Sequence, residues 1–335
     1  MVGYKQRDSY FDLVKALAIF LVVLGHCGAS LHSMYLENFI VGCNMPLFFI
    51  LSGWFAYDTI RNRDAKRLLR HLRSYLQPVL STALVFAILS AVIGLIPWMS
   101  VGTYALKRVL FSAWFLWVLS IVYLICFSIS LVVESFKWYC LASVAVFGTL
   151  LFIPNILSGI LQIHSVRHMM PYFIVGQILR WYDFRPWKIT RLGMTAFLLF
   201  AIFVVFEGDV RQNNMGFYWV ESSWRGVLCG QINFISFIAR NIVGVIGAVG
   251  VMWIVHELKY CLKHGCEVAF MGRYTICIYL LHFWFYERLL SCCSVLFTAF
   301  WSVVLVSVAL TMFCSLTGWW TMEKVKFLRS ILWGR

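Results

Sequence analysis

The chain has 335 residues, of which 62% are hydrophobic and only 13% charged, and this balance excludes a soluble globular protein. Its formal net charge of +14 could indicate a nucleic-acid partner. However, the lysines and arginines gather mainly in the segments that a membrane topology places on one side. The positive charge therefore reflects which segments face the cytoplasmic side of the membrane, and nucleic-acid binding is not expected.

Repeated apolar runs of about 20 residues predict an all-α polytopic membrane protein with about ten spans, forming a single domain over residues 1–335. The excess of lysine and arginine in alternate segments predicts that both termini are cytoplasmic. The first run is of full length, with no small-residue cleavage site after it, so an uncleaved first span is expected. The expected spans are residues 10–28, 39–57, 75–97, 112–133, 138–156, 168–182, 192–208, 233–255, 268–287 and 294–317.

The first span carries three ionisable side chains, Asp12, Lys15 and His26. At about 100° per residue, Lys15 and His26 differ by only about 20° around the helix, and Asp12 and His26 by about 40°. All three therefore share one face, along ~21 Å of helix. Ionisable groups inside a span normally face a bundle interior or a wet cavity, so this face is a functional candidate. The structural alternative is an Asp12–Lys15 pair at one interface, with His26 at the opposite headgroups.

The 11 cysteines show no metal-type spacing, and most lie in apolar runs, where cysteine behaves as a small hydrophobe. No metal site is expected. Cys27 and Cys43 fall at the outer ends of the first two spans. The sequence is compatible with a disulfide between these two cysteines and equally with two free thiols.

Two segments between spans stand out. Residues 61–73 are rich in arginine and are expected to form a cytoplasmic loop. Residues 207–232 form a long outside segment that mixes aromatic side chains with carboxylates and amides. That composition suits sugar binding and suits an ordinary interfacial loop equally well.

Polar residues also lie inside two late spans. Arg240 lies well within the eighth span and needs a wet cavity or, alternatively, a structural partner across the bundle. Thr275, Tyr279 and His282 share a stripe on the ninth span, because they are spaced at i, i+4 and i+7. His282 is expected toward the outside, as is His26. The alternative for His282 is a purely structural role, as a buried histidine whose hydrogen bonds are made within the core.

Several motifs resemble the acyltransferase 3 family, whose members are integral membrane enzymes that acylate sugars of surface glycans. The first is Asp12-x-x-Lys15 followed after ten residues by His26, and then a span that begins Met45-Pro46-Leu47-Phe48-Phe49 and closes on Ser52-Gly53. The resemblance continues in the basic segment Arg61 to Arg73 before Pro78, in Trp114-Phe115-Leu116-Trp117, and in Met170-Pro171-Tyr172-Phe173 to Gly176. Gly272-Arg273-Tyr274-Thr275 to Tyr279-Leu280-Leu281-His282 is similar to the sugar O-acetylase branch, which includes fucose 4-O-acetylase-like proteins.

Two positions depart from the family pattern. Lys15 stands where most members carry arginine. Lysine keeps the positive charge but cannot form the two parallel hydrogen bonds of a guanidinium group. Asn44 stands where the sugar-acetylase branch commonly has histidine before Met-Pro, so a proton-transfer role there is lost. Both departures bear on the substrate class more than on the chemistry.

The resemblance implies transfer of an acetyl group from cytoplasmic acetyl-CoA to a sugar hydroxyl, in the cytoplasmic (inner) membrane of a bacterium. Such transfer needs a base for the hydroxyl proton and a grip on the donor's phosphates. His26 is the expected general base, since imidazole titrates near neutral pH. The full assignment is His26, Asp12 and His282 as catalytic residues, Lys15, Arg61, Arg67, Arg70 and Arg73 for the donor, and Asn44, Trp114, Tyr279 and Arg240 for the acceptor.

A transporter or flippase for a sugar-linked substrate is the alternative function, since it could use the same polar face. It predicts internal repeats between two halves, and the sequence shows no such self-similarity. A sensor or scaffold would leave the placement of Lys15, His26 and His282 unexplained. The acceptor sugar, the exact acyl group, an acyl-histidine intermediate and the oligomeric state stay open.

Overall fold

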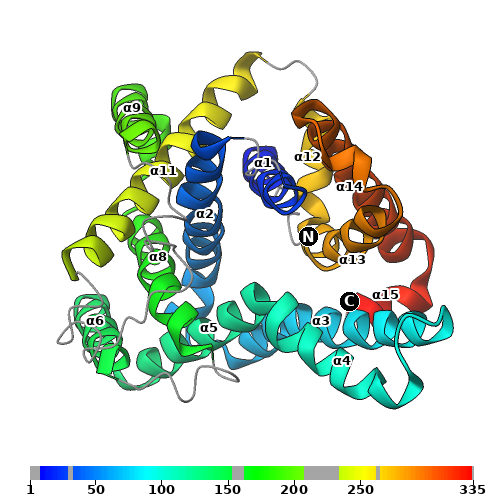
Figure 1. Ribbon diagram of the computed structural model, residues 1–335. Helices are drawn as coiled ribbons and strands as arrows, with labels where there is room; N and C mark the ends of the chain where they lie inside the picture. The colour runs from blue at the N-terminus through cyan, green and yellow to red at the C-terminus, as the bar shows by residue number, and fades with distance from the viewer. Residues whose placement is uncertain (1–7, 29–32, 153–161, 207–233, 262–264, 334–335) are drawn as a thin grey trace.

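The computed structural model describes residues 8–28, 33–152, 162–206, 234–261 and 265–333, and the regular structure of these residues is entirely helical (Figure 1). The main helices are α1 (Ser9–His26), α2 (Met34–Arg61), α3 (Ala65–Val92), α4 (Val101–Lys107), α5 (Trp114–Val132), α6 (Phe136–Phe152), α8 (Ile163–Trp181), α9 (Thr190–Phe206), α11 (Phe234–Cys261), α12 (Gly265–Arg273), α13 (Thr275–Cys292), α14 (Phe300–Trp319) and α15 (Lys326–Trp333).

The predicted fold class, an all-helical polytopic membrane protein, is confirmed by the helices of the structure. Every predicted span overlaps a helix of the structure. In the described part of the chain, six helices are long and apolar enough to cross a membrane: Ser9–His26, Met34–Arg61, Ala65–Val92, Trp114–Val132, Ile238–Lys259 and Phe300–Lys324. Two more apolar helices, Phe136–Leu150 and Thr190–Phe206, are shorter. The cytoplasmic placement of the termini stays a prediction.

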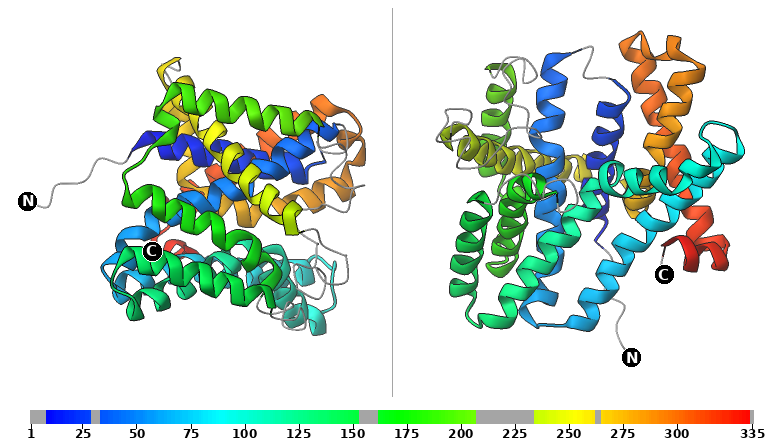
Figure 2. Two further views of the ribbon diagram at one scale, coloured as in Figure 1. Left: turned by 90° about the vertical axis from the view of Figure 1, so that its left-hand side faces the viewer. Right: turned by 60° about the horizontal axis from the view of Figure 1, so that its bottom comes forward.

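Helix α1 lies at the centre of the molecule. It contacts α2 and α11 on one side and α12, α13 and α14 on the other. The right-hand view of Figure 2 shows α1 and α2 side by side, with α13 and α14 beyond α1. The sequence explains this position, since ionisable side chains inside a span, here Asp12 and Lys15, normally face the interior of a bundle and not lipid. The start of α1 is fixed by Asp8, whose carboxylate accepts a hydrogen bond from the Tyr10 backbone N–H at 2.9 Å.

Helices α2 and α8 pack with their backbones in direct contact. A Cβ atom at Gly53 would overlap the backbone carbonyl of Phe173, so only glycine fits at this crossing. Both helices also contain an internal proline, Pro46 in α2 and Pro171 in α8. Such prolines are tolerated in membrane helices because neighbouring helices satisfy the freed backbone groups. The two proline-containing motifs found in the sequence therefore meet in one helix pair.

The predicted ninth span, residues 268–287, is not one continuous helix. It divides into α12 and α13 at Tyr274, which makes a turn with a hydrogen bond from its N–H to the Met271 carbonyl at 3.1 Å. The Thr275 hydroxyl also donates to the Gly272 carbonyl at 2.8 Å. Apolar residues run on both sides of the break, so hydropathy does not detect it.

Cys27 and Cys43 are both buried free thiols. Cys43 donates a hydrogen bond from its Sγ to the Phe39 carbonyl at 3.1 Å, one turn earlier in α2. Of the two alternatives open from the sequence, the structure therefore has free thiols.

Candidate active site

The rings of His26 and His282 lie against each other, with centroids 5.3 Å apart and planes inclined by 39°. His26 is the last residue of α1, and His282 lies in the middle of α13. Near the start of α1, Gly272 packs directly on the backbone of Asp12. The chain therefore runs in the same direction through α1 and through α12 and α13. This parallel packing brings together two histidines that are 256 positions apart in the sequence.

His282 has a defined tautomer. Its ring is 2% exposed, and Nδ1 lies 2.9 Å from the carbonyl oxygen of Ile278. A carbonyl can only accept, so Nδ1 carries the proton in this hydrogen bond, and Nε2 of the neutral ring is left as an acceptor. Among the described residues this buried Nε2 has no hydrogen-bond partner. His26, in contrast, is exposed. The pair thus joins a buried, oriented imidazole to an accessible one.

Tyr279 anchors α13 to the start of α5. Its hydroxyl accepts a hydrogen bond from the Phe115 N–H at 3.2 Å and donates one to the Ser112 carbonyl at 3.3 Å. Its ring centroid is 6.1 Å from that of His282. Trp114 lies beside Phe115, with ring centroids 6.4 Å apart. Two of the predicted acceptor residues, Tyr279 and Trp114, therefore lie near the histidine pair.

Arg108 is a buried cation close to this region, and the sequence analysis did not single it out. It begins the π-helix η3 (Arg108–Ser112), a type of element often found at functional sites. Its Nη1 lies 3.6 Å from Oε2 of Glu287, and its guanidinium lies 5.3 Å from the centre of the Phe86 ring. A cavity of about 20 Å³ between Arg108, Tyr279 and neighbouring residues has room for a single water molecule. The sequence contained one signal for this ion pair, because Glu287 ends a predicted span and an acidic group there needs a basic partner.

The polar face of α1 is divided between two environments. Asp12 is 2% exposed, and its Oδ2 lies 4.0 Å from Nε of Arg273, which is largely exposed. Lys15 is half-buried, with its ammonium 4.7 Å from the centre of the Phe55 ring on α2. Arg273 was quoted in the sequence only as part of a motif. The structure gives it a role as a partner of the buried carboxylate.

Residues 61–73, expected to form a loop, are instead mostly helical, because α2 ends at Arg61 and α3 begins at Ala65. The predicted donor residues Arg67, Arg70 and Arg73 therefore lie on the first three turns of α3. Asp64 caps α3 by accepting from the Arg67 backbone N–H at 2.9 Å. Arg61 donates to the Tyr57 hydroxyl at 3.1 Å, and Arg73 donates from Nε to Oε1 of Gln77 at 2.8 Å. Arg61, Arg70 and Arg73 are exposed. They form a basic surface at the end of the bundle that is opposite to His26 along α2.

Asn44 and Arg240 lie around a different helix crossing. Asn44 is buried, and its Oδ1 accepts from the Met45 N–H at 2.6 Å. The Arg240 carbonyl accepts from the Tyr172 hydroxyl at 3.4 Å. A Cβ atom on Gly244, one turn after Arg240, would meet both Tyr172 and Pro46, so α2, α8 and α11 cross here. The segment 207–232, considered for sugar binding, lies outside the described residues.

The described residues contain no group of three or more histidine, cysteine, aspartate or glutamate side chains that could hold a metal ion. A sequence model described as an acyltransferase domain matches residues 8–320. No curated protein and no solved structure matches the chain. The matched range includes the histidine pair, the Asp12–Arg273 contact and the basic surface.

Proposed function

The chain belongs to the acyltransferase 3 family and is a membrane acyltransferase, and from this premise we propose that it moves an acetyl group from cytoplasmic acetyl-CoA to a hydroxyl of a cell-surface or lipid-linked sugar. The motif that ends on His282 supports the sugar O-acetylase branch, the one with fucose 4-O-acetylase-like members. The cytoplasmic membrane of a bacterium is the proposed location.

The observation that carries this proposal is the contact between the His26 and His282 rings. His26 is the accessible member, so we assign it the role of general base. It takes the proton of the sugar hydroxyl as the oxygen attacks the thioester carbonyl. The new C–O bond replaces the C–S bond, and the proton passes from His26 to the departing thiolate of CoA.

His282 is proposed to position His26. Its Nδ1–H is held by the Ile278 carbonyl, which leaves Nε2 as a buried acceptor next to the second ring. A neutral acceptor beside His26 can hold the ring of the base in one orientation and stabilise its protonated form. Asp12 is assigned to the same polar face, where its pairing with Arg273 ties α12 to α1.

The donor is proposed to enter at the basic end of the bundle. Lys15, Arg67, Arg70 and Arg73 would bind the phosphates of CoA through charge-assisted contacts. The rise from Lys15 to His26 along α1 is ~16 Å, a little over half of the ~30 Å hydrocarbon core. An extended pantetheine arm could cover that distance. Asn44, Trp114, Tyr279 and Arg240 remain the candidate acceptor contacts.

The direct test is the mass of glycans from cells that carry the wild-type gene, no gene, or the His26→Ala variant. Wild-type cells should show glycans heavier by one acetyl group, and both other strains should lack that difference. Loss of a general base lowers the rate by about 10²- to 10⁴-fold, which is below detection in such an assay. Lys188→Ala, which removes an exposed side chain outside the proposed sites, is the control and should keep the acetyl group. Normal acetylation by an inserted His26→Ala protein would remove His26 from the mechanism.

A further inference from the structure

A cavity of about 520 Å³ opens at the basic end of the bundle, between the end of α2, the turn from α5 to α6 and the end of α8. Three cations line it, Arg61, Arg63 and Lys137, against one carboxylate, Glu134. Arg63 donates to the Ser130 carbonyl at 2.8 Å and lies 3.7 Å from Glu134. The cavity therefore carries an excess of positive charge, and it suits an anion.

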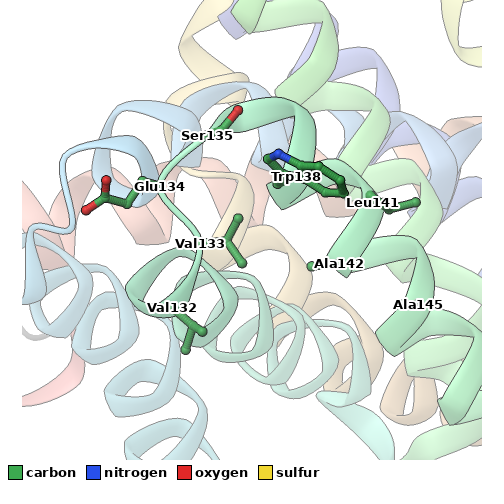
Figure 3. Close-up of a pocket in the computed structure, with 8 residues that line it drawn as sticks. All are labelled: Val132, Val133, Glu134, Ser135, Trp138, Leu141, Ala142 and Ala145. Carbon is green, nitrogen blue, oxygen red and sulfur yellow. The ribbon is translucent and has the colours of Figure 1, made fainter.

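An apolar groove of about 660 Å³ continues from this cavity along the outer side of α6, and the two share Val133, Glu134 and Ser135. Figure 3 shows its walls, with Val132 at the end of α5, Val133 in the turn that follows, and Trp138, Leu141, Ala142 and Ala145 on α6. Val132, Trp138 and Leu141 are all exposed large hydrophobic residues. The groove thus begins at a charged turn and then presents only apolar side chains.

The dimensions of the groove match one leaflet of a bilayer. From Glu134 to Ala145 the chain advances 11 residues, nearly all of them helical, or about 16 Å. Half of the ~30 Å hydrocarbon core is about the same length. Trp138 and Trp181, next to the cavity, are residues of the type enriched at the membrane interface. This match would place the charged cavity at headgroup level and the far end of the groove at the centre of the bilayer.

A buried amide with an N–H donor that is unpaired among the described residues also lines the cavity. Gln177 is 1% exposed, and its Oε1 accepts from the Tyr139 hydroxyl at 2.7 Å. Within the described part of the chain, its Nε2 has no hydrogen-bond partner. Buried polar groups are normally satisfied, so this amide is a donor awaiting an acceptor oxygen.

This site is separate from the proposed reaction path. Gly25, next to His26, faces Ile40 near the start of α2, whereas Arg61 ends α2, ~32 Å further along the helix. The Phe55 ring beneath Lys15 and the Tyr57 side chain in the cavity are about 200° apart around α2, and so on opposite faces. A thioester arm that starts in this cavity would have to pass around α2 before rising to the histidines.

We propose that the cavity and the groove together bind an anionic glycerophospholipid of the leaflet at the basic end of the bundle. Its phosphate lies between Arg61, Arg63 and Lys137, a headgroup oxygen accepts from Gln177, and one acyl chain fills the groove on α6. Arg61 then binds the lipid phosphate. The phosphates of CoA are bound by Lys15 and by Arg67, Arg70 and Arg73 of α3. The bound lipid closes the gap between the α5–α6 turn and the ends of α2 and α8.

The test is native mass spectrometry of the detergent-purified full chain titrated with phosphatidylglycerol, phosphatidylcholine or glycerol phosphate. Wild-type protein should retain phosphatidylglycerol more tightly than phosphatidylcholine and should not bind glycerol phosphate. Lys137→Gln should lower the affinity for phosphatidylglycerol about fivefold, the effect of one cation at a membrane surface. Lys188→Gln makes the same charge change outside the cavity and should leave the affinity unchanged.

A second pair of variants tests the groove without changing charge. Ala145→Phe places a ring in the groove and should lower binding of phosphatidylglycerol, whereas Val144→Phe, on the same helix but outside the groove, should not. Equal retention of the two lipids would overturn the proposal, as would equal effects of either variant and its control. Binding of glycerol phosphate, or displacement of the lipid by CoA, would assign the cavity to a soluble phosphate or to the donor. None of these outcomes depends on acetyl transfer, so the proposed function is tested separately.

Discussion

At the scale of single residues, Lys15 is the cation whose role a substitution can isolate. Its ammonium lies over the Phe55 ring, so the group is held in place within the helix bundle. If Lys15 binds the phosphates of CoA, Lys15→Arg should retain activity, while Lys15→Met should raise the KM for acetyl-CoA much more than the KM for the sugar. Phe55→Leu keeps the charge and removes the ring, and it should have the smaller effect. A donor KM that does not change in Lys15→Met would make the residue purely structural.

Arg108 should matter for stability because it is the buried partner of Glu287. Arg108→Met leaves that carboxylate without this cation and removes the cation over Phe86, at a cost of about 1–3 kcal/mol of unfolding free energy. Arg108→Lys should recover part of the loss. Thermal unfolding in detergent measures both variants. If Arg108→Met melts at the wild-type temperature, the ion pair contributes nothing measurable and the assignment is wrong.

At the scale of elements, the seam between α12 and α1 sets the distance between the two histidines. Gly272→Val would push its side chain into the backbone of Asp12, and such overpacking typically costs about 1–3 kcal/mol. Since α13 follows directly from α12, acetyl transfer should fall together with stability. Gly148→Val is the matched control, because a Cβ atom at Gly148 meets open space. A Gly272→Val protein with normal turnover would show that this seam does not position His282.

The helices could be located from the sequence because apolar runs of span length leave little choice in a membrane. The break at Tyr274 could not, because apolar residues continue through it and the turn depends on contact between α12 and α1. For the same reason the π-helix at Arg108 was not predicted. Both features come from tertiary packing, and hydropathy does not record it.

The candidate site was predictable in part. Helical periodicity placed Asp12, Lys15 and His26 on one face, and the topology placed His282 on the same side as His26. Their ring contact depends on which helices neighbour each other, which periodicity within one helix does not determine. Asp12 was open to pairing with Lys15, and the structure adds Arg273 from a distant helix as its ion-pair partner.

At the scale of the whole molecule, the account depends on two ends with different chemistry. The proposed donor arginines Arg67, Arg70 and Arg73 lie on α3 near one end of α2, and the histidine pair lies near the other end. The bias of lysine and arginine predicts that the basic end is cytoplasmic. A transferase that carries acetyl across the membrane needs the donor on one side and the acceptor on the other. A transporter or flippase instead needs one substrate to reach both sides.

The most direct test of this account uses sealed vesicles in which the protein has a single orientation. Acetyl-CoA is supplied only on the face that bears residues 61–73, and the acceptor sugar only on the opposite face. Free CoA should then appear on the donor face and the acetylated sugar on the histidine face, with neither forming in vesicles that carry His26→Ala. Product that forms only when the sugar is on the donor's own face would contradict transfer across the membrane.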